Sequence, residues 1–114
     1  MSKPYIDFIV THHNEPWNIG RKFFLMLSMQ RNVDFDKINV IIVQDGVEGA
    51  LEWKSIFESC PYNVNVVTIP HSGIAAARNV GIQNATADWV MFCDFDDMFS
   101  DVYSLYMLLN VLHL

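Results

Sequence analysis

Four short runs of almost unbroken apolar residues constrain the fold of this chain more than any other feature. They cover residues 5–11, 38–43, 64–69 and 89–93, and each is rich in β-branched or aromatic side chains. Such runs are typical of strands. A strand that is apolar at nearly every position must be covered on both faces, and this favours a parallel sheet between two layers of helices.

The segments between these runs have a helical period. The first predicts a helix that starts near Pro16, and the second predicts a shorter helix that ends before Pro61. The third predicts a helix over residues 74–83, with Ser72 as its N-cap. Its three consecutive alanines at 75–77 are expected to let this helix lie close to the sheet.

The alternation of strands and helices predicts an α/β fold in one domain of residues 1–114. We expect a Rossmann-like, doubly wound, mainly parallel sheet in the order 3-2-1-4, with helices on both faces. Ligands of such sheets bind beyond the carboxyl ends of the strands. The polar segments that follow the four strands, at 11–15, 44–46, 71–73 and 94–97, are therefore the candidate functional positions.

Composition narrows the function classes. The chain is 52% hydrophobic and 18% charged, which indicates a folded domain, and its net charge of −6 argues against a nucleic-acid binder. A nucleotide bound by so acidic a chain needs a cation at its phosphates. Two cysteines, Cys60 and Cys93, are too few for a disulfide framework and indicate a reducing, cytoplasmic compartment. Without a signal peptide or a membrane-length apolar run, we expect a soluble chain.

The strongest chemical signal follows the fourth strand, where Asp94, Asp96 and Asp97 lie within four residues. Hard oxygen ligands at the end of a strand suit Mg²⁺ or Mn²⁺. In extended backbone Asp94 and Asp96 point to the same side, so one metal-bound diphosphate would meet both. The residues alone suit a polar turn about equally well, with Asp97 capping a helix that begins near residue 99.

The first two strands also end in polar residues. Asp45 leaves the second strand at a glycine turn, either as a ligand of a base or ribose or as part of an ordinary Asp-Gly turn. Thr11, His12 and His13 end the first strand. Adjacent strand residues face opposite ways, so the two histidines are not expected to bind one ion. We expect His13 to stack on a nucleobase and His12 to make local hydrogen bonds.

Arg78 lies on the third predicted helix, one position off its small apolar face. Its guanidinium group suits a diphosphate or a carboxylate in the crevice. A structural ion pair with an acidic neighbour such as Asp94 is nearly as good an interpretation.

These pieces occur in one particular order along the chain: IVTHHN (9–14), VQDG (43–46), GIAAARNVGI (73–82) and VMFCDFDD (90–97). Together they resemble glycosyltransferase family 2, the inverting enzymes of the GT-A fold. The similarity covers almost the whole chain. The chain differs from the usual family pattern in having His13 where a tyrosine is common, and Gln44-Asp45 where two acids are frequent.

The resemblance implies a nucleoside-diphosphate sugar as donor, held through Mn²⁺ or Mg²⁺ at the D-x-D motif. Asp96 is then the direct metal ligand, and Asp94 reaches the metal through water or contacts the ribose and sugar. By the same resemblance, Thr11 and His13 line the base pocket and Asp45 approaches the base or ribose. Uridine is the default base, which makes a UDP-sugar the expected donor.

The resemblance further implies transfer of the sugar to a glycan, lipid or protein. In similar enzymes the acceptor site and the catalytic base follow the D-x-D motif, so this chain is expected to supply the donor-binding half and its catalytic base is not assigned. The apolar residues at 105–114 are expected to be covered by self-association of the chain. A full-length protein is expected in the cytoplasm, at the inner face of the membrane.

Two other function classes stay open at this point. One is a non-catalytic module that only binds a nucleotide sugar. The other is a different α/β nucleotide enzyme, such as a nucleotidyltransferase, although the chain lacks the glycine-rich phosphate loops G-x-G-x-x-G and G-x-x-x-x-G-K.

Overall fold

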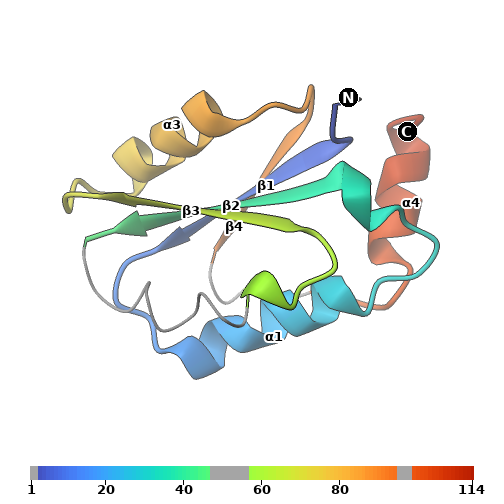
Figure 1. Cartoon of the computed structure of the whole chain (residues 1–114), viewed down its shortest axis with the longest axis horizontal. Coiled ribbons are helices and arrows are strands. Elements are labelled where there is room, and N and C mark those ends of the chain that lie inside the picture. The colour runs from blue at the N-terminus through green and yellow to red at the C-terminus, as the bar shows by residue number, and fades with distance from the viewer. Residues whose placement is uncertain (1–2, 47–56, 95–98) are drawn as a thin grey trace.

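A computed structural model describes residues 3–46, 57–94 and 99–114 of the chain. Its strands β1 (Ile6–His12), β2 (Ile38–Asp45), β3 (Asn63–Ile69) and β4 (Val90–Asp94) form one sheet in the order β3-β2-β1-β4. All three pairings between neighbouring strands are parallel (Figure 1). The predicted sheet and strand order are confirmed, and the strand bounds differ from the predicted ones by one or two residues.

Helices cover both faces of the sheet. Figure 1 shows α1 (Trp17–Ser28) on one side and α3 (Ile74–Asn84) on the other. The short helix η1 (Phe35–Lys37) leads into β2, and α4 (Ser104–Val111) packs into the same core as α1. The fully buried side chains of this core are contributed by β1, β2, α1 and α4: Ile6, Phe8, Val10, Phe23, Leu27, Ile38, Val40, Ile42 and Leu105.

The predicted second helix lies largely on residues 47–56, outside the described part of the chain. At its expected end, Phe57 is buried, and its ring centroid is 5.1 Å from that of Phe24 on α1. Among the described residues, none of the helices is both long enough and apolar enough to cross a membrane.

Helix α3 approaches the sheet closely because two of its residues are small. Ala77 is fully buried against β2, and a Cβ added to Gly81 would lie 2.3 Å from Cγ2 of Ile9 on β1. The prediction that three alanines allow this contact is right only for Ala77, since Ala75 is exposed and Ala76 is half-buried. The backbone of α3 can lie this near β1 only because Gly81 lacks a side chain.

The N-cap of α3 is Gly73, so the prediction of Ser72 was wrong. Gly73 has a φ of 93°, a conformation that glycine adopts without strain. The Ser72 hydroxyl does not reach into the helix and donates to the carbonyl of Pro70 at 2.7 Å. A positive φ at this position is not readable from the spacing of apolar residues.

Helix α4 begins at Ser104, later than the predicted start near residue 99. Leu105 and Leu109 are buried in the core, while Met107 and Val111 are 60% and 74% exposed. The buried Gln30 joins α4 to α1, because its side chain accepts from the backbone N–H of Leu105 and donates to the carbonyl of residue 101. The apolar end of the chain is thus partly covered by its own core.

Asp7 is a carboxylate fully buried within β1. It accepts hydrogen bonds from the side chain of Asn39 on β2 and from the backbone N–H groups of Thr86 and Ala87. These contacts fasten the connection between α3 and β4 to the amino-terminal end of the central strand β1. Asp7 therefore fixes where β4 enters the sheet.

We predict that Gly81→Ala destabilises the fold. Alanine favours a helix by about 1 kcal/mol over glycine, but the new methyl group would overlap Ile9, and overpacking typically costs about 1–3 kcal/mol. Urea unfolding should therefore show a net loss of stability. Asn79→Ala on the exposed face of α3 is the control and should change little. A more stable Gly81→Ala protein would contradict the close approach of α3 to β1.

Candidate functional site

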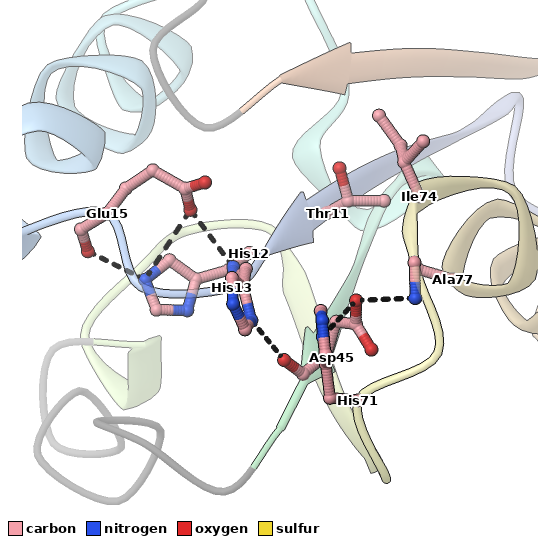
Figure 2. A pocket seen from close by; sticks show the side chains of 9 residues that line it. Thr11, His12, His13, Glu15, Asp45, His71, Ile74 and Ala77 are labelled. Carbon is pink, nitrogen blue, oxygen red and sulfur yellow. Dashed lines mark hydrogen bonds and ion pairs between the residues drawn. The ribbon is translucent and has the colours of Figure 1, made fainter.

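A pocket of about 190 Å³ opens at the carboxyl ends of β1 and β2, beside the start of α3 (Figure 2). It brings together Thr11, His13 and Asp45, three of the predicted site residues. Glu15 and His71 were expected only as members of the polar segments 11–15 and 71–73, without a role of their own. The full lining consists of Thr11, His12, His13, Glu15, Asp45, His71, Gly73, Ile74 and Ala77.

Asp45 organises one wall of this pocket. Its carboxylate accepts from the backbone N–H groups of Ser72 at 2.6 Å and Gly73 at 3.0 Å, and it lies 3.1 Å from Nδ1 of His71. Burial alone would raise the pKa of Asp45, but the backbone hydrogen bonds and the neighbouring His71 together hold this pKa below its usual value. The end of β2 thus carries an ionised acceptor that fastens the loop before α3.

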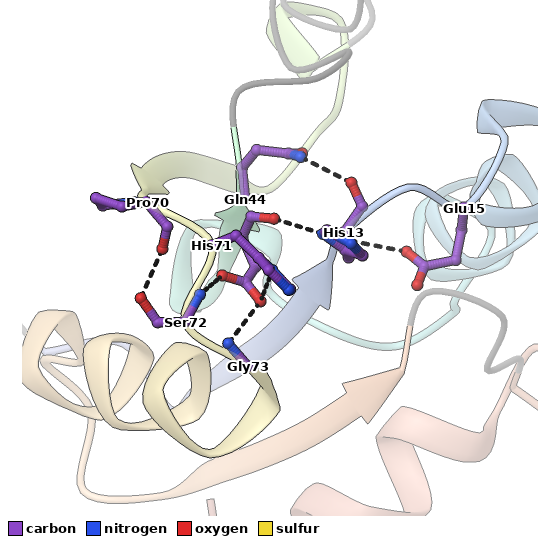
Figure 3. A network of polar contacts seen from close by, with 8 residues as sticks. His13, Glu15, Gln44, Pro70, His71, Ser72 and Gly73 are labelled. Carbon is purple, nitrogen blue, oxygen red and sulfur yellow. Dashed lines mark hydrogen bonds and ion pairs between the residues drawn. The ribbon is translucent and has the colours of Figure 1, made fainter.

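His13 and His71 stack on each other (Figure 3), with ring centroids 4.2 Å apart and planes 20° apart. His13 Nδ1 lies 2.7 Å from the backbone carbonyl oxygen of Asp45, and His71 Nδ1 faces its carboxylate. Since both partners are acceptors, each Nδ1 acts as the donor. In the neutral rings, each Nε2 then carries the lone pair.

His12 and His13 have different surroundings, since His12 is buried and His13 is not. The His12 ring has Nδ1 2.5 Å from the side-chain oxygen of Gln44 and Nε2 2.7 Å from the carbonyl of Glu15. Gln44 in turn donates to the carbonyl of His13, and Glu15 accepts from the backbone N–H of His13. These contacts hold the segment after β1 in place, so His12 has the local role expected of it.

Arg78 and Asp94 lie together at the next strand end. Arg78 Nη2 is 3.7 Å from Asp94 Oδ1, and its guanidinium group is 5.4 Å from the ring centroid of Phe92. Asp94 is paired in register with Thr11, which places this ion pair at the same edge of the sheet as the pocket. Both side chains are about half exposed, so the pair contributes little to stability.

Two interpretations of Arg78 were open, contact with a ligand in the crevice and a structural ion pair with Asp94. The structure contains the ion pair. Asp96 and Asp97 lie outside the described residues, so the metal ligation expected of Asp96 stays a prediction.

A group able to hold a cation does lie within the described part of the chain. His13, Asp45 and His71 each offer one ligand atom, and these atoms all lie within 4.8 Å of one another. The adjacent pair His12 and His13 was not expected to bind one ion, and this group of three was not predicted. The available signal was the position of His71 directly after the third strand.

We predict that Asp45→Asn destabilises the protein at neutral pH by about 1–3 kcal/mol, because the new amide nitrogen would face one of the backbone N–H groups of Ser72 and Gly73, which then lacks its acceptor. Since the pKa of Asp45 is lowered by folding, its stabilising effect is present above the usual carboxyl range and is lost as the pH falls below about 3.8. Urea unfolding of both proteins in chelator, at pH 7 and pH 3, measures this. A difference that is equal at both pH values would contradict the account of Asp45.

Comparison with known proteins identifies relatives over nearly the whole chain. The sequence model of the family described as "Glycosyl transferase family 2" matches residues 7–113. The uncharacterized glycosyltransferase YwdF of Bacillus subtilis (strain 168) is 37% identical over 62 residues, which are 54% of this chain and 22% of that protein. The putative glycosyltransferase EpsH of the same organism is 28% identical over 109 residues, or 95% of this chain and 30% of EpsH.

The fold matches solved structures of TarS from S. aureus. TarS 1–349 superposes with a TM-score of 0.82 at 20% identity, over 96% of this chain and 32% of that chain. Its complex with UDP-GlcNAc gives 0.83 at 20% identity, over 96% of this chain and 31% of that chain. This chain therefore spans at most about a third of the length of these relatives. The family match over residues 7–113, together with the parallel sheet and its order, shows that the chain belongs to glycosyl transferase family 2.

Proposed function

We propose that the chain binds a nucleoside-diphosphate sugar at the carboxyl edge of its sheet and serves in transfer of that sugar to an acceptor. The observation that carries the proposal is the convergence of three strand ends. Thr11 on β1, Asp45 on β2 and Asp94 on β4 lie at one edge of adjacent parallel strands. Family membership supports the reaction class, and the TarS complex with UDP-GlcNAc supports a UDP-sugar as donor.

The nucleoside is proposed to occupy the pocket between β1, β2 and α3. Asp45 offers an ionised acceptor to a base or ribose, and Thr11 on β1 offers a hydroxyl group to the same pocket. His13 offers a ring for stacking, although one of its faces already contacts His71. A base that stacks on this pair would lengthen an existing stack.

The diphosphate is proposed to lie toward β4. Arg78 and Asp94 are both about half exposed there, and a guanidinium group suits a phosphate. Asp94 is a carboxylate at a strand end, the kind of ligand that Mn²⁺ and Mg²⁺ take, so the described part of the motif fits the ion. We propose Asp96 as the direct ligand and Asp94 beside it. The ion would supply positive charge that stabilises the leaving diphosphate.

Inverting transfer also needs a base that removes the proton of the acceptor hydroxyl. We assign this role to none of the described residues, and the acceptor class stays open among glycans, lipids and proteins. A module that binds the nucleotide sugar without transferring it is the alternative, and an assay of donor hydrolysis distinguishes the two. Self-association through the exposed face of α4, and a location in the cytoplasm or at the inner face of the membrane, stay predictions.

We predict that UDP binds only with Mn²⁺ or Mg²⁺, because otherwise the carboxylates would meet the diphosphate with like charge. Asp96→Asn should weaken UDP binding in the presence of the metal by at least about tenfold. Loss of a residue that only supports a metal ligand already weakens metal binding by about tenfold or more, and Asp96 is proposed as a direct ligand. Titration calorimetry with and without chelator measures both effects, and a thermal melt checks the fold.

Asp88→Asn is the matched control, since Asp88 is an exposed aspartate whose described ion pair is with Lys3. Equal UDP affinity with and without the metal would show that the carboxylates are structural. An equal loss of affinity in the control would contradict the assignment of Asp96.

A further inference from the structure

We infer that His13, Asp45 and His71 form a second cation site, selective for a transition-metal ion such as Zn²⁺ or Co²⁺. The three side chains come from the residue after β1, the end of β2 and the loop before α3 (Figure 2). This site is distinct from the Mn²⁺ or Mg²⁺ site proposed at Asp94 and Asp96. Binding of the ion itself does not depend on the proposed function.

The distances suit one ion. His71 Nδ1 and Asp45 Oδ2 are 3.1 Å apart. Two ligands of a tetrahedral ion, each about 2.0–2.1 Å from it, are separated by roughly 3.3 Å. An ion can therefore replace the hydrogen that now lies between these atoms. The third ligand atom, on His13, lies within 4.8 Å of the other two. His71 can turn so that all three ligands meet one ion, because its side chain is 62% exposed.

The orientation of His13 favours ligation. Its Nδ1 donates to the backbone carbonyl of Asp45 at 2.7 Å, which leaves the lone pair on Nε2. A metal-binding histidine usually donates its other N–H to a carbonyl or carboxylate in this way. Asp45 is supported similarly, by the backbone N–H groups of Ser72 and Gly73. Both ligands are thus held by neighbouring groups before an ion arrives.

The ligand types decide which ion is preferred. Two imidazoles and one carboxylate suit Zn²⁺ and the related ions Co²⁺ and Ni²⁺, whereas Mg²⁺ prefers oxygen ligands. Three protein ligands leave a fourth position for water or another small ligand. The site should therefore bind Zn²⁺ in the presence of an excess of Mg²⁺.

One consequence does rest on the proposed function. The same three side chains line the pocket proposed for the nucleoside. An ion that engages Asp45 and both rings removes them from contact with a base, so Zn²⁺ should compete with UDP. Zinc would then act as an inhibitor of nucleotide binding and not as its cofactor.

The test is a Co²⁺ titration of the protein without nucleotide, followed by visible absorption, with Zn²⁺ added to displace the Co²⁺. A four-coordinate site gives intense absorption bands. His71→Ala and His13→Ala should each weaken Co²⁺ binding by at least about tenfold, since loss of even an outer partner costs roughly 10- to 100-fold. His113→Asn is the control, because His113 is exposed and asparagine tolerates its φ of 61°.

Unchanged Co²⁺ affinity in His71→Ala, or an equal loss in the His113→Asn control, would overturn the site. Thermal melts of the variants confirm that each remains folded. In a second arm, UDP affinity in Mg²⁺ is measured with and without Zn²⁺. If Co²⁺ binding depends on His71 but Zn²⁺ leaves UDP affinity unchanged, the ion site stands and the proposed place of the nucleoside is wrong.

Discussion

The buried carboxylate of Asp45 is the contact on which the candidate site depends most. It lies at the end of β2 and accepts hydrogen bonds from Ser72 and Gly73, the two residues that precede α3. It also faces His71, while its backbone carbonyl holds His13. Through this one residue the ends of β1 and β2 and the start of α3 are fixed relative to one another, and the pocket lies between them.

The apolar packing of the sheet holds the carboxyl ends of its strands, where the polar groups of the site lie, in fixed positions. The central strands β1 and β2 are buried along nearly their whole length, and α3 packs against them through Ala77 and Gly81. Asp7 fixes the chain before β4 by its hydrogen bonds to Thr86 and Ala87. A rigid apolar base of this kind positions strand ends precisely enough for the loops beyond them to bind a ligand.

The architecture could be predicted from the sequence because it depends on long apolar runs. The four runs located each strand found among the described residues, and their alternation with helices predicted the parallel order. Thr11, His13 and Asp45 were found for a related reason, since each directly follows or ends such a run and therefore lies at the carboxyl edge. Arg78 and Asp94 lie at that edge too, as an ion pair.

The remaining features depend on contacts between residues that are far apart in the sequence. The positive φ of Gly73 is set by the hydrogen bonds of its loop to Asp45, and no local preference of Ser72 reveals it. The stacking of His71 on His13 joins two loops, so neither histidine alone predicted it. The structural role of Asp7 was not predicted either. Its hydrogen-bond partners Asn39, Thr86 and Ala87 are far from it in the sequence and meet it only in the folded chain.

Ligand type separates the two proposed cation sites. Carboxylates at the end of β4 suit a hard ion at a diphosphate, whereas the two imidazoles and the carboxylate between β1, β2 and α3 suit a softer one. One edge of the sheet would thus distinguish metals by ligand type. The net charge of −6 favours cations at both places.

The most direct test of the central claim is an NMR titration of ¹⁵N-labelled protein with UDP-GlcNAc and Mg²⁺. If the nucleotide sugar binds at the carboxyl edge, the backbone amides of Thr11, His13, Ser72 and Gly73 should show the largest shift changes. A second cavity of about 540 Å³ lies between α1 and the segment before β3, lined in part by Arg21, Leu25 and Cys60. Shift changes centred on that cavity, with the amides at the edge unaffected, would contradict the account.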